Sequence, residues 1–176
     1  TFKAYSLLAT RVNYPFHAGI TEAGTLFRGS LKSVAGLSLL IREGLADTIR
    51  ISLTAPPEKE VEVANLLLQD LGLKKAGINF VSCPGCGRSQ VDIQKLATQV
   101  ERRISSLKAS LTVAVMGCPV NGPGEAKEAD IGVAGGQGTG IIFKKGKIIK
   151  KVPADKIVDE LVKEVFNLVD EERKSE

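Results

Sequence analysis

The sequence predicts an α/β part over residues 1–76 and an α+β domain over residues 77–176, and three observations lead to this prediction. Helix-like and strand-like stretches alternate over the first part, as they do in a parallel α/β sheet or barrel. In the second part, two strand-like stretches, 78–82 and 111–116, each lead into a loop that carries cysteine. Three further strand-like stretches and a last amphipathic helix follow them, which is typical of an α+β domain.

The first part opens with a helical pattern in which apolar residues recur from Phe2 to Val12. Residues 16–21 are a short strand candidate, and residues 30–43 are predicted to form the next helix. The apolar face predicted for that helix consists of Leu31, Val34, Leu37 and Ile41.

A second strand candidate spans residues 47–54, and Pro56-Pro57 then open a third helix, because proline fits the first helical turn. The apolar face predicted for this helix consists of Val61, Ala64, Leu67, Leu68 and Leu71. Gly72 fits a helix stop, and residues 74–77 are the expected linker. Two strands cannot close a barrel, and the chain begins without Met inside a helical pattern. We therefore expect a fragment of a longer protein.

The second part places a helical pattern, residues 92–108, between its first two strand candidates. If these strands are parallel neighbours, their C-terminal ends share one edge of the sheet. The loops that carry Cys83 and Cys118 would then meet. A final helix is expected after Pro153, and a hairpin around Gly146. The remaining strands are expected near residues 131–134, 140–143 and 147–152.

The composition is that of an ordinary globular protein, with 43% hydrophobic and 25% charged residues. No apolar run reaches the roughly 18 residues of a membrane span, and no signal-peptide pattern is present, so we expect a cytoplasmic protein. The net charge of +4 is spread evenly, and the basic run 143–151 is interpreted as a solvated hairpin. Aromatic residues, at 5% with no Trp, leave few candidates for stacking on nucleic-acid bases.

The three cysteines point to metal or redox chemistry, since an odd number in a cytoplasmic chain argues against disulfides. Cys83 and Cys86 form a CxxC pair, a spacing that zinc sites and redox sites share. Cys118 lies on a Gly/Pro-rich loop whose amides could donate hydrogen bonds to cluster sulfides. Three thiolates would leave one iron of a cubane cluster for another ligand, and Glu125 could cover it.

Two other interpretations of the cysteines stay open on spacing alone. Zinc could be held by the three thiolates together with His17 or Glu125. The three thiols could also be unrelated buried side chains. The alternative function is therefore a zinc-stapled basic module that binds nucleic acid.

Longer motifs surround the cysteines and the polar residues of the first part. The cysteine motifs are Cys83-Pro-Gly-Cys86-Gly-Arg88 and Met116-Gly-Cys118-Pro-Val-Asn121-Gly-Pro-Gly-Glu125-Ala126. The motifs of the first part are His17-Ala-Gly-Ile-Thr21-Glu22-Ala-Gly24, Lys32-Ser33 and Asp47-Thr-Ile-Arg50-Ile-Ser52-Leu53. Together they resemble hydroxymethylbutenyl diphosphate synthase, a family of the non-mevalonate isoprenoid pathway, and the similarity spans essentially the whole chain.

The resemblance implies that residues 1–76 are the last two strand–helix units of a TIM barrel. It implies that residues 77–176 form an iron–sulfur domain that resembles the modules of sulfite and nitrite reductases. The implied reaction is a two-electron reductive ring opening and dehydration, which converts methylerythritol cyclodiphosphate to hydroxymethylbutenyl diphosphate. Reduced ferredoxin or flavodoxin would supply the electrons, and the full-length protein would be a homodimer, without nucleic acid or membrane as partner.

The resemblance also implies roles for individual residues. Cys83, Cys86 and Cys118 would be the thiolate ligands of a [4Fe–4S] cluster. Glu125 would be its fourth ligand, displaced when a substrate oxygen reaches the iron, and Glu22 is a candidate for proton transfer. The expected substrate-binding residues are His17, Thr21, Lys32, Arg50, Ser52 and Asn121. Several of these lie near the C-terminal ends of strand candidates, where the sites of TIM barrels are built.

Each of the polar residues also has a plainer interpretation. Lys32 could be a solvated helix residue, and Arg50 could belong to a surface ion pair. His17 could be an ordinary strand histidine, and Glu22 could simply favour a helix N-terminus. Asn121 could do no more than shape its turn.

Overall fold

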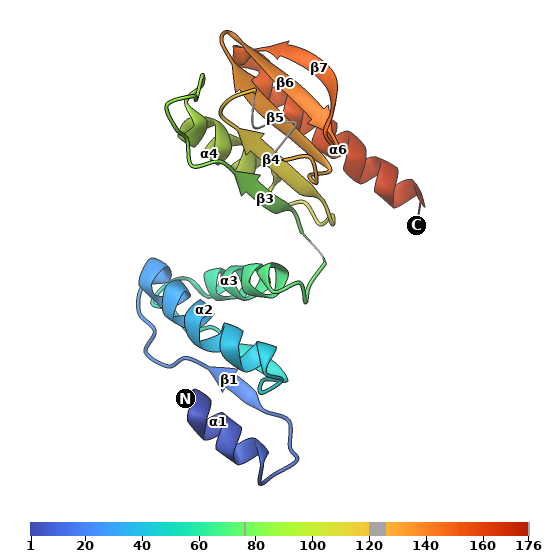
Figure 1. Ribbon diagram of the computed structural model, residues 1–176. Helices are drawn as coiled ribbons and strands as arrows, with labels where there is room; N and C mark the ends of the chain where they lie inside the picture. The colour runs from blue at the N-terminus through green and yellow to red at the C-terminus, as the bar shows by residue number, and fades with distance from the viewer. Residues whose placement is uncertain (76, 120–125, 176) are drawn as a thin grey trace. The chain divides into compact units, whose positions relative to one another are not determined.

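The computed structural model describes residues 1–75, 77–119 and 126–175 (Figure 1). The chain divides into two compact units, Thr1–Lys75 and Ala76–Glu176. The first unit contains a two-stranded sheet and the second a five-stranded sheet. Within the described part of the chain, no helix combines the length and the apolar character that crossing a membrane requires.

The first unit alternates helices and strands, as the sequence predicts. Its elements are α1 (Phe2–Ala9), β1 (His17–Gly19), α2 (Leu26–Arg42), β2 (Thr48–Arg50) and α3 (Pro57–Asp70). The two strands pair in parallel, with Ala18 opposite Ile49. Parallel neighbours need a crossover connection, and α2 provides it. The backbone N–H of Phe16 donates to the Asp47 carboxylate at 2.6 Å, which holds the starts of the two strands together.

Helix α2 confirms only part of its predicted apolar face, where Leu37 is buried and Ile41 packs partly buried against the same core. Of the predicted face, Leu37 is buried, but Leu31 and Val34 are 58% and 40% exposed. The residues of α2 that are buried are Gly29, Ser33, Leu37 and Leu40. A Cβ at Gly29 would lie 2.4 Å from Leu53 Cδ2, so the helix backbone packs closely against the segment after β2. Close packing selected small residues that a search for apolar spacing passes over, and α2 also begins at Leu26 rather than at residue 30.

The predicted strands of the first unit were too long. Each of β1 and β2 spans three residues, against predictions of 16–21 and 47–54. Beyond β1 and β2, the segments that follow the two strands meet at an isolated parallel bridge between Thr25 and Thr54. The opening helix is also shorter, ends at Ala9 and buries none of its residues.

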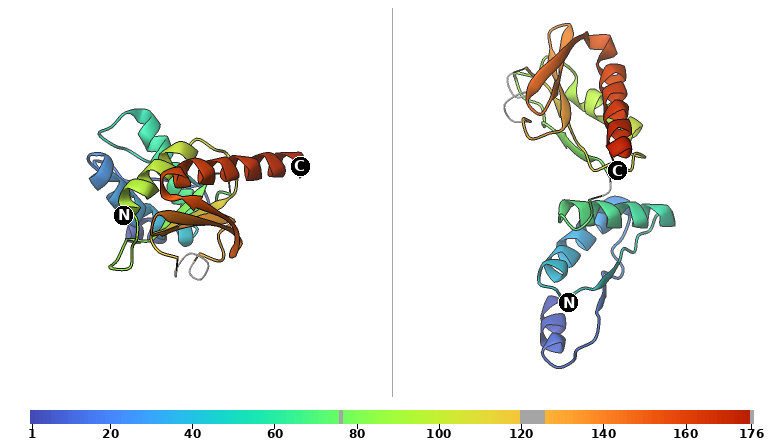
Figure 2. Two further views of the ribbon diagram at one scale, coloured as in Figure 1. Left: turned by 90° about the horizontal axis from the view of Figure 1, so that it is seen from above. Right: turned by 90° about the vertical axis from the view of Figure 1, so that its right-hand side faces the viewer.

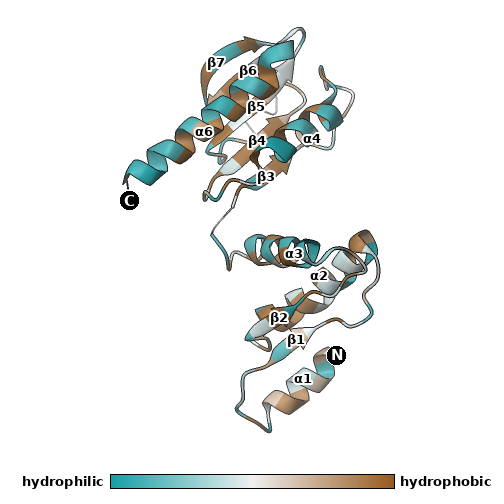
Figure 3. Cartoon of the chain, turned by 180° about the vertical axis from the view of Figure 1, so that it is seen from behind, coloured by the Kyte–Doolittle hydropathy of each residue, from teal (hydrophilic) through white to brown (hydrophobic). Residues whose placement is uncertain are grey.

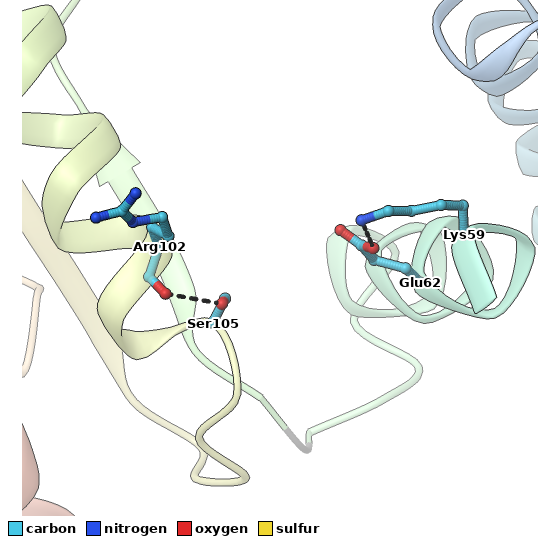
Figure 4. A network of polar contacts seen from close by, with 4 residues as sticks. All are labelled: Lys59, Glu62, Arg102 and Ser105. Atoms are coloured by element: carbon cyan, nitrogen blue, oxygen red, sulfur yellow. Dashed lines mark hydrogen bonds and ion pairs between the residues drawn. The ribbon is translucent and has the colours of Figure 1, made fainter. Parts of the chain in front are cut away.

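Helix α3 confirms part of its predicted apolar face. Leu67 is buried in the core of this unit, whereas Val61 is 62% exposed. Lys59 and Glu62 form an ion pair beside Val61, one turn apart on the same helix (Figure 4). This part of α3 therefore faces solvent.

The second unit contains every strand and helix that the sequence predicts. Its elements are β3 (Asn79–Ser82), α4 (Ile93–Ile104), β4 (Thr112–Met116), β5 (Ile131–Gly136), β6 (Thr139–Lys144), β7 (Lys147–Pro153), the 3-10 turn η1 (Ala154–Lys156) and α6 (Ile157–Ser175). The strands lie in the order β3-β4-β5-β6-β7, with β3, β4 and β5 parallel and the last two pairs antiparallel. Lys145 and Gly146, with φ of 49° and 74°, form the turn of the predicted hairpin.

Side chains of β4, an inner strand of the sheet, alternate between two cores. Val113 and Val115 join the large core beneath α4 and α6. Ala114 and Met116 join a smaller core on the other face of the sheet, together with Phe143. Helix α6 runs along one face of the sheet (Figure 2), and its hydrophilic and hydrophobic residues alternate above largely hydrophobic strands (Figure 3). The predicted apolar face of α4 is confirmed by the buried residues Ile93, Leu96, Val100 and Ile104.

Helix α4 is bounded by polar side chains at both ends. The Asp92 carboxylate accepts the backbone N–H of Lys95 at 3.0 Å, which caps the start of the helix. After the last turn, Ser105 Oγ donates to the Arg102 carbonyl at 3.2 Å (Figure 4). The helix therefore ends at Ile104, four residues before the predicted end.

Candidate functional site

The loops that carry Cys83 and Cys118 meet at one edge of the five-stranded sheet, as predicted. Strands β3 and β4 are parallel with Ser82 opposite Val115, so the residues that follow both strands lie side by side. The Cys83 N–H donates to the Val115 carbonyl at 3.2 Å. The backbone N–H of Gly117 donates to Cys83 Sγ at 3.2 Å. One cysteine sulfur thus already accepts a hydrogen bond from the loop that carries another cysteine.

The three thiols differ in their exposure. Cys118 is buried, Cys83 is half-buried and Cys86 is exposed. Among the described residues, no three His, Cys, Asp or Glu side chains are grouped so that they could hold a metal ion. A cleft of about 470 Å³ is lined by residues of β3 and α4 and by Cys83. The thiols therefore share one sheet edge without forming a closed set of ligands.

Cys86 lies in a turn that favours its thiolate. A hydrogen bond from the Arg88 backbone lowers the pKa of the Cys86 thiol, and a hydrogen bond from the Arg88 side chain lowers it further. The Cys86 N–H donates to Ser89 Oγ at 3.2 Å, and the Ser89 N–H donates to the Cys86 carbonyl at 2.9 Å. Thiolates are the form in which cysteine binds metals. The chemistry of this edge, soft sulfur ligands with backbone N–H donors, fits an iron–sulfur cluster.

Two residues predicted for this site, Asn121 and Glu125, lie outside the described residues. Their expected roles, substrate binding and the fourth cluster ligand, stay predictions.

The first unit brings Thr21 and Arg50 together at the C-terminal ends of its parallel strands. Gly19 pairs in register with Arg50. The Arg50 guanidinium donates to Thr21 Oγ1 at 2.9 Å. A Cβ at Gly19 would lie 3.0 Å from Arg50 Nε, so the arginine side chain lies across the glycine. This arrangement leaves a guanidinium and a hydroxyl at the strand ends, both suited to an anionic ligand.

His17 lies at the start of β1, at the opposite end of that strand from Gly19. Its Nδ1 is hydrogen-bonded to Thr48 Oγ1 at 2.8 Å across the parallel pair. Successive side chains of a strand point to opposite faces, and Ala18 is fully buried in the core under α2. His17 and Thr48 therefore share a polar face with Arg50, on the side of the sheet away from that core.

Three further residues of this unit, Glu22, Ser52 and Lys32, were predicted to bind substrate or to transfer a proton. Glu22 lies in the turn after β1 with a left-handed φ of 53°, and its side chain is exposed. Ser52 follows β2 and is half-buried. Lys32 lies within the second turn of α2, inside the range 30–43 predicted to be helical, and is exposed. Its role in substrate binding stays a prediction.

Some residues of both sites were missed by sequence reasoning. Gly19 carries a signal that could have revealed it, since glycine within a strand often marks a close approach of other atoms. Thr48 could have been found from its place opposite His17 once the parallel register is known. Ser89 and Gln90, which hold the CxxC loop, have no signal in their spacing.

Comparison with known families matches both units. The profile described as "GcpE protein C-terminal domain" matches residues 79–167, and the "GcpE TIM-barrel domain" matches residues 1–65. The chain belongs to the GcpE family. The first of these domains covers the cysteine edge, and the second covers the strands that carry His17 and Arg50.

Curated relatives in this family are more than 50% identical to the chain over the aligned residues. The protein of Clostridium acetobutylicum is 54% identical over 165 residues, and that of Caldanaerobacter subterraneus is 56% identical over 172 residues. These matches cover 94% and 98% of the chain but 47% and 48% of the relatives, so the chain spans about half of their length. A Geobacter sulfurreducens relative is 52% identical over 97% of the chain.

All three relatives are named 4-hydroxy-3-methylbut-2-en-1-yl diphosphate synthase (flavodoxin). The resemblance found in the sequence motifs is thereby confirmed. The alternative of a zinc-stapled nucleic-acid-binding module finds no support in these comparisons.

Proposed function

We propose that this chain forms the C-terminal half of a 4-hydroxy-3-methylbut-2-en-1-yl diphosphate synthase, an iron–sulfur oxidoreductase of isoprenoid biosynthesis. The observation that carries the proposal is more than 50% identity, over nearly the whole chain, to relatives with that name. The reaction would be the two-electron reductive ring opening and dehydration of 2-C-methyl-D-erythritol 2,4-cyclodiphosphate. Reduced flavodoxin, which the relatives' names include, is the proposed electron donor, with ferredoxin as the other candidate.

Cys83, Cys86 and Cys118 would hold a [4Fe–4S] cluster, and Glu125 would be its fourth ligand. When bound, such a cluster supplies electrons and an iron with Lewis-acid character for a substrate oxygen. Hydrogen bonds at the thiols support this assignment. The Gly117 N–H, which donates to Cys83 Sγ, would stabilise the thiolate and lower its electron donation to iron. The Arg88 backbone would do the same at Cys86, whose pKa it lowers.

The polar face of the first unit would bind the diphosphate of the substrate. Arg50 would form charge-assisted hydrogen bonds to phosphate oxygens, and Thr21, already bonded to its guanidinium, would hold it in that orientation. The further residues proposed to bind substrate are His17, Lys32, Ser52 and Asn121. Glu22, exposed in the turn after β1, is the proposed group for proton transfer.

The proposal extends to the setting of the enzyme. We place it in the cytoplasm, where thiols stay reduced and available to a cluster. The full-length protein would be a homodimer, and the second unit would resemble the modules of sulfite and nitrite reductases.

Turnover by a full-length protein that contains this chain tests the proposal. Under anaerobic conditions, with reduced flavodoxin and the cyclodiphosphate, mass spectrometry should detect the linear hydroxymethylbutenyl diphosphate. Arg50→Ala should raise KM by about tenfold or more, because it removes a charge-assisted hydrogen bond to phosphate. The 176-residue chain alone should show no turnover, since it spans only about half of the relatives. A cluster-loaded full-length protein that forms no product would contradict the proposal.

A further inference from the structure

The loop that contains Cys86 is fastened at both the end of β4 and the end of β5. The backbone N–H of Gln90 donates to the Gly117 carbonyl, just after β4, at 2.9 Å. The side-chain Oε1 of Gln90 accepts the backbone N–H of Gln137, just after β5, at 2.8 Å. One residue of this loop therefore bridges the ends of two neighbouring strands.

Two glycines allow the loop to lie so close to the strand ends. A Cβ at Gly117 would lie 2.7 Å from Ser89 Oγ and 3.5 Å from Cys83 Sγ. A Cβ at Gly135 would lie 2.4 Å from Val91 Cγ2. At distances under 3.0 Å, a Cβ at either position would force the neighbouring side chain of the loop to move. The contact of the loop with the strand ends thus depends on the glycines of β5 and of the Cys118 loop.

The fastened part of the loop is bonded to Cys86 through one residue. Ser89 precedes Gln90 and exchanges two hydrogen bonds with Cys86, one from each backbone N–H. Cys86 is the exposed thiol of the three, and the Arg88 backbone and side chain donate hydrogen bonds to its sulfur. Among the contacts that position Cys86, those with Ser89 connect its turn to the bridge that Gln90 makes.

We infer that Gln90 is a positioning residue for the cysteine site. Its side-chain oxygen ties the Cys86 turn to the end of β5 and so fixes the position of the Cys86 thiolate. This inference rests on the proposed function, because it concerns the cluster that the cysteines would hold. Gln90 is hydrogen-bonded to Gly117 and Gln137, and it acts on Cys86 through its neighbour Ser89. The structure assigns the role to the Oε1 acceptor rather than to the bulk of the side chain, since that atom receives the Gln137 N–H.

Variants at position 90 separate the acceptor from the side chain. Gln90→Ala removes Oε1 but keeps the backbone bond to Gly117, and the site is exposed, so the fold should persist. Gln90→Glu keeps an oxygen that can accept from Gln137. Gln99→Ala, an exposed glutamine of α4, is the matched control.

The test is the rate at which an iron chelator removes the cluster from the full-length protein under anaerobic conditions, followed by its absorbance. Loss should be about fivefold faster in Gln90→Ala, the factor that one hydrogen bond of about 1 kcal/mol supports. It should match wild type in Gln90→Glu and Gln99→Ala. In the metal-free protein, amide hydrogen exchange at residue 137 should also be faster in Gln90→Ala.

The possible outcomes distinguish a failure of the inference about Gln90 from a failure of the proposed function. Equal rates of cluster loss in wild type and Gln90→Ala overturn the inference and leave the proposed function intact. Loss as fast in Gln90→Glu as in Gln90→Ala overturns the role of the acceptor. A wild-type protein that takes up no cluster overturns the proposed function and the inference with it.

Discussion

Arg50 lies across the two-stranded sheet of the first unit because position 19 has no side chain. Gly19 pairs with Arg50 in register, and the guanidinium passes over it to reach Thr21. A methyl group at position 19 would lie 3.0 Å from Nε and 3.2 Å from Cβ of Arg50. The orientation of the proposed diphosphate-binding residue thus depends on the absence of a side chain at position 19.

Gly19→Ala should therefore displace the Arg50 side chain from Thr21. In the full-length enzyme we expect KM for the cyclodiphosphate to rise about tenfold, because roughly 1.4 kcal/mol of binding is lost with a misplaced charged hydrogen-bond donor. Steady-state kinetics measure this change.

A double-mutant cycle supplies the control for this prediction. In an Arg50→Ala background, Gly19→Ala should have no further effect on KM, since the side chain that it displaces is gone. Additive effects of the two substitutions would show that Gly19 acts in another way.

Residue placement was predicted where strand ends are marked in the sequence. Thr21 and Arg50 were both expected near the ends of parallel strands, and the structure brings them into contact. The start of α2 was placed four residues too late, and the Thr25 side chain before it makes no capping hydrogen bond. Gln90 could not be found, since its role depends on loop contacts that only the folded chain defines.

At the scale of elements, the sheet of the second unit accommodates the ring of Phe143 because a glycine, Gly132, stands opposite it on the neighbouring strand. Phe143 of β6 is fully buried and pairs with Gly132 of β5. A Cβ at Gly132 would lie 2.4 Å from Phe143 Cζ and 2.8 Å from the Ala114 carbonyl oxygen. Because the carbonyl is backbone, the strand could relieve the clash only by distorting its pairing.

Gly132→Ala should lower the free energy of unfolding of the metal-free chain by about 1–3 kcal/mol, the cost of overpacking a dense core. Urea denaturation followed by circular dichroism measures it. Gly87→Ala is the control, because a Cβ there would meet nothing within 4 Å, and it should change stability by less than about 0.5 kcal/mol. Equal stability of the two variants would contradict the packing described for Phe143.

An ion pair between Lys150 and Glu160 joins β7 to α6. The hydrogen bond from Lys150 lowers the pKa of Glu160, and the same bond raises the pKa of Lys150. A lowered carboxylate pKa gives stability that is present above its unfolded value and lost as pH falls through the folded value. A raised lysine pKa gives stability that is complete below its unfolded value and lost as pH rises through the folded value.

Lys150→Gln should therefore lower the melting temperature slightly near neutral pH, where both groups are charged. The difference from wild type should shrink between about pH 5 and pH 3, as Glu160 becomes protonated in both proteins. Lys151→Gln, on the same strand, is the control for the loss of a positive charge. A difference that persists unchanged at about pH 3 would show that the ion pair does not cause it.

Elements were predicted better in the second unit than in the first. Strands such as β4 carry continuous apolar runs, and α4 carries a regular apolar stripe, so both are marked by periodicity. Helix α2 instead packs through Gly29 and Ser33, whose small side chains do not register as an apolar face. The predicted face is only partly right there, with Leu37 and Ile41 in the core, because close backbone packing as well as apolar area decides which side is buried.

At the scale of the whole molecule, the chain contains two parts of one family's architecture. The first unit matches a TIM-barrel domain and carries the polar strand ends, and the second carries all three cysteines. The sequence predicted this division into types of structure, because alternating and mixed element orders differ visibly along the chain. What it could not predict is the hydrogen bonding of the cysteine edge, which arises only when β3 and β4 pair.

Metal analysis of the 176-residue chain tests most directly whether Cys83, Cys86 and Cys118 hold one cluster. The chain is reconstituted anaerobically with iron and sulfide and then assayed for iron, sulfide and zinc, beside the Cys118→Ser variant. We predict about four irons and four sulfides per chain, the content of one [4Fe–4S] cluster, and loss of most of both in Cys118→Ser. Stoichiometric zinc in a colourless protein, or equal iron in wild type and Cys118→Ser, would contradict the assignment of one cluster to the three cysteines.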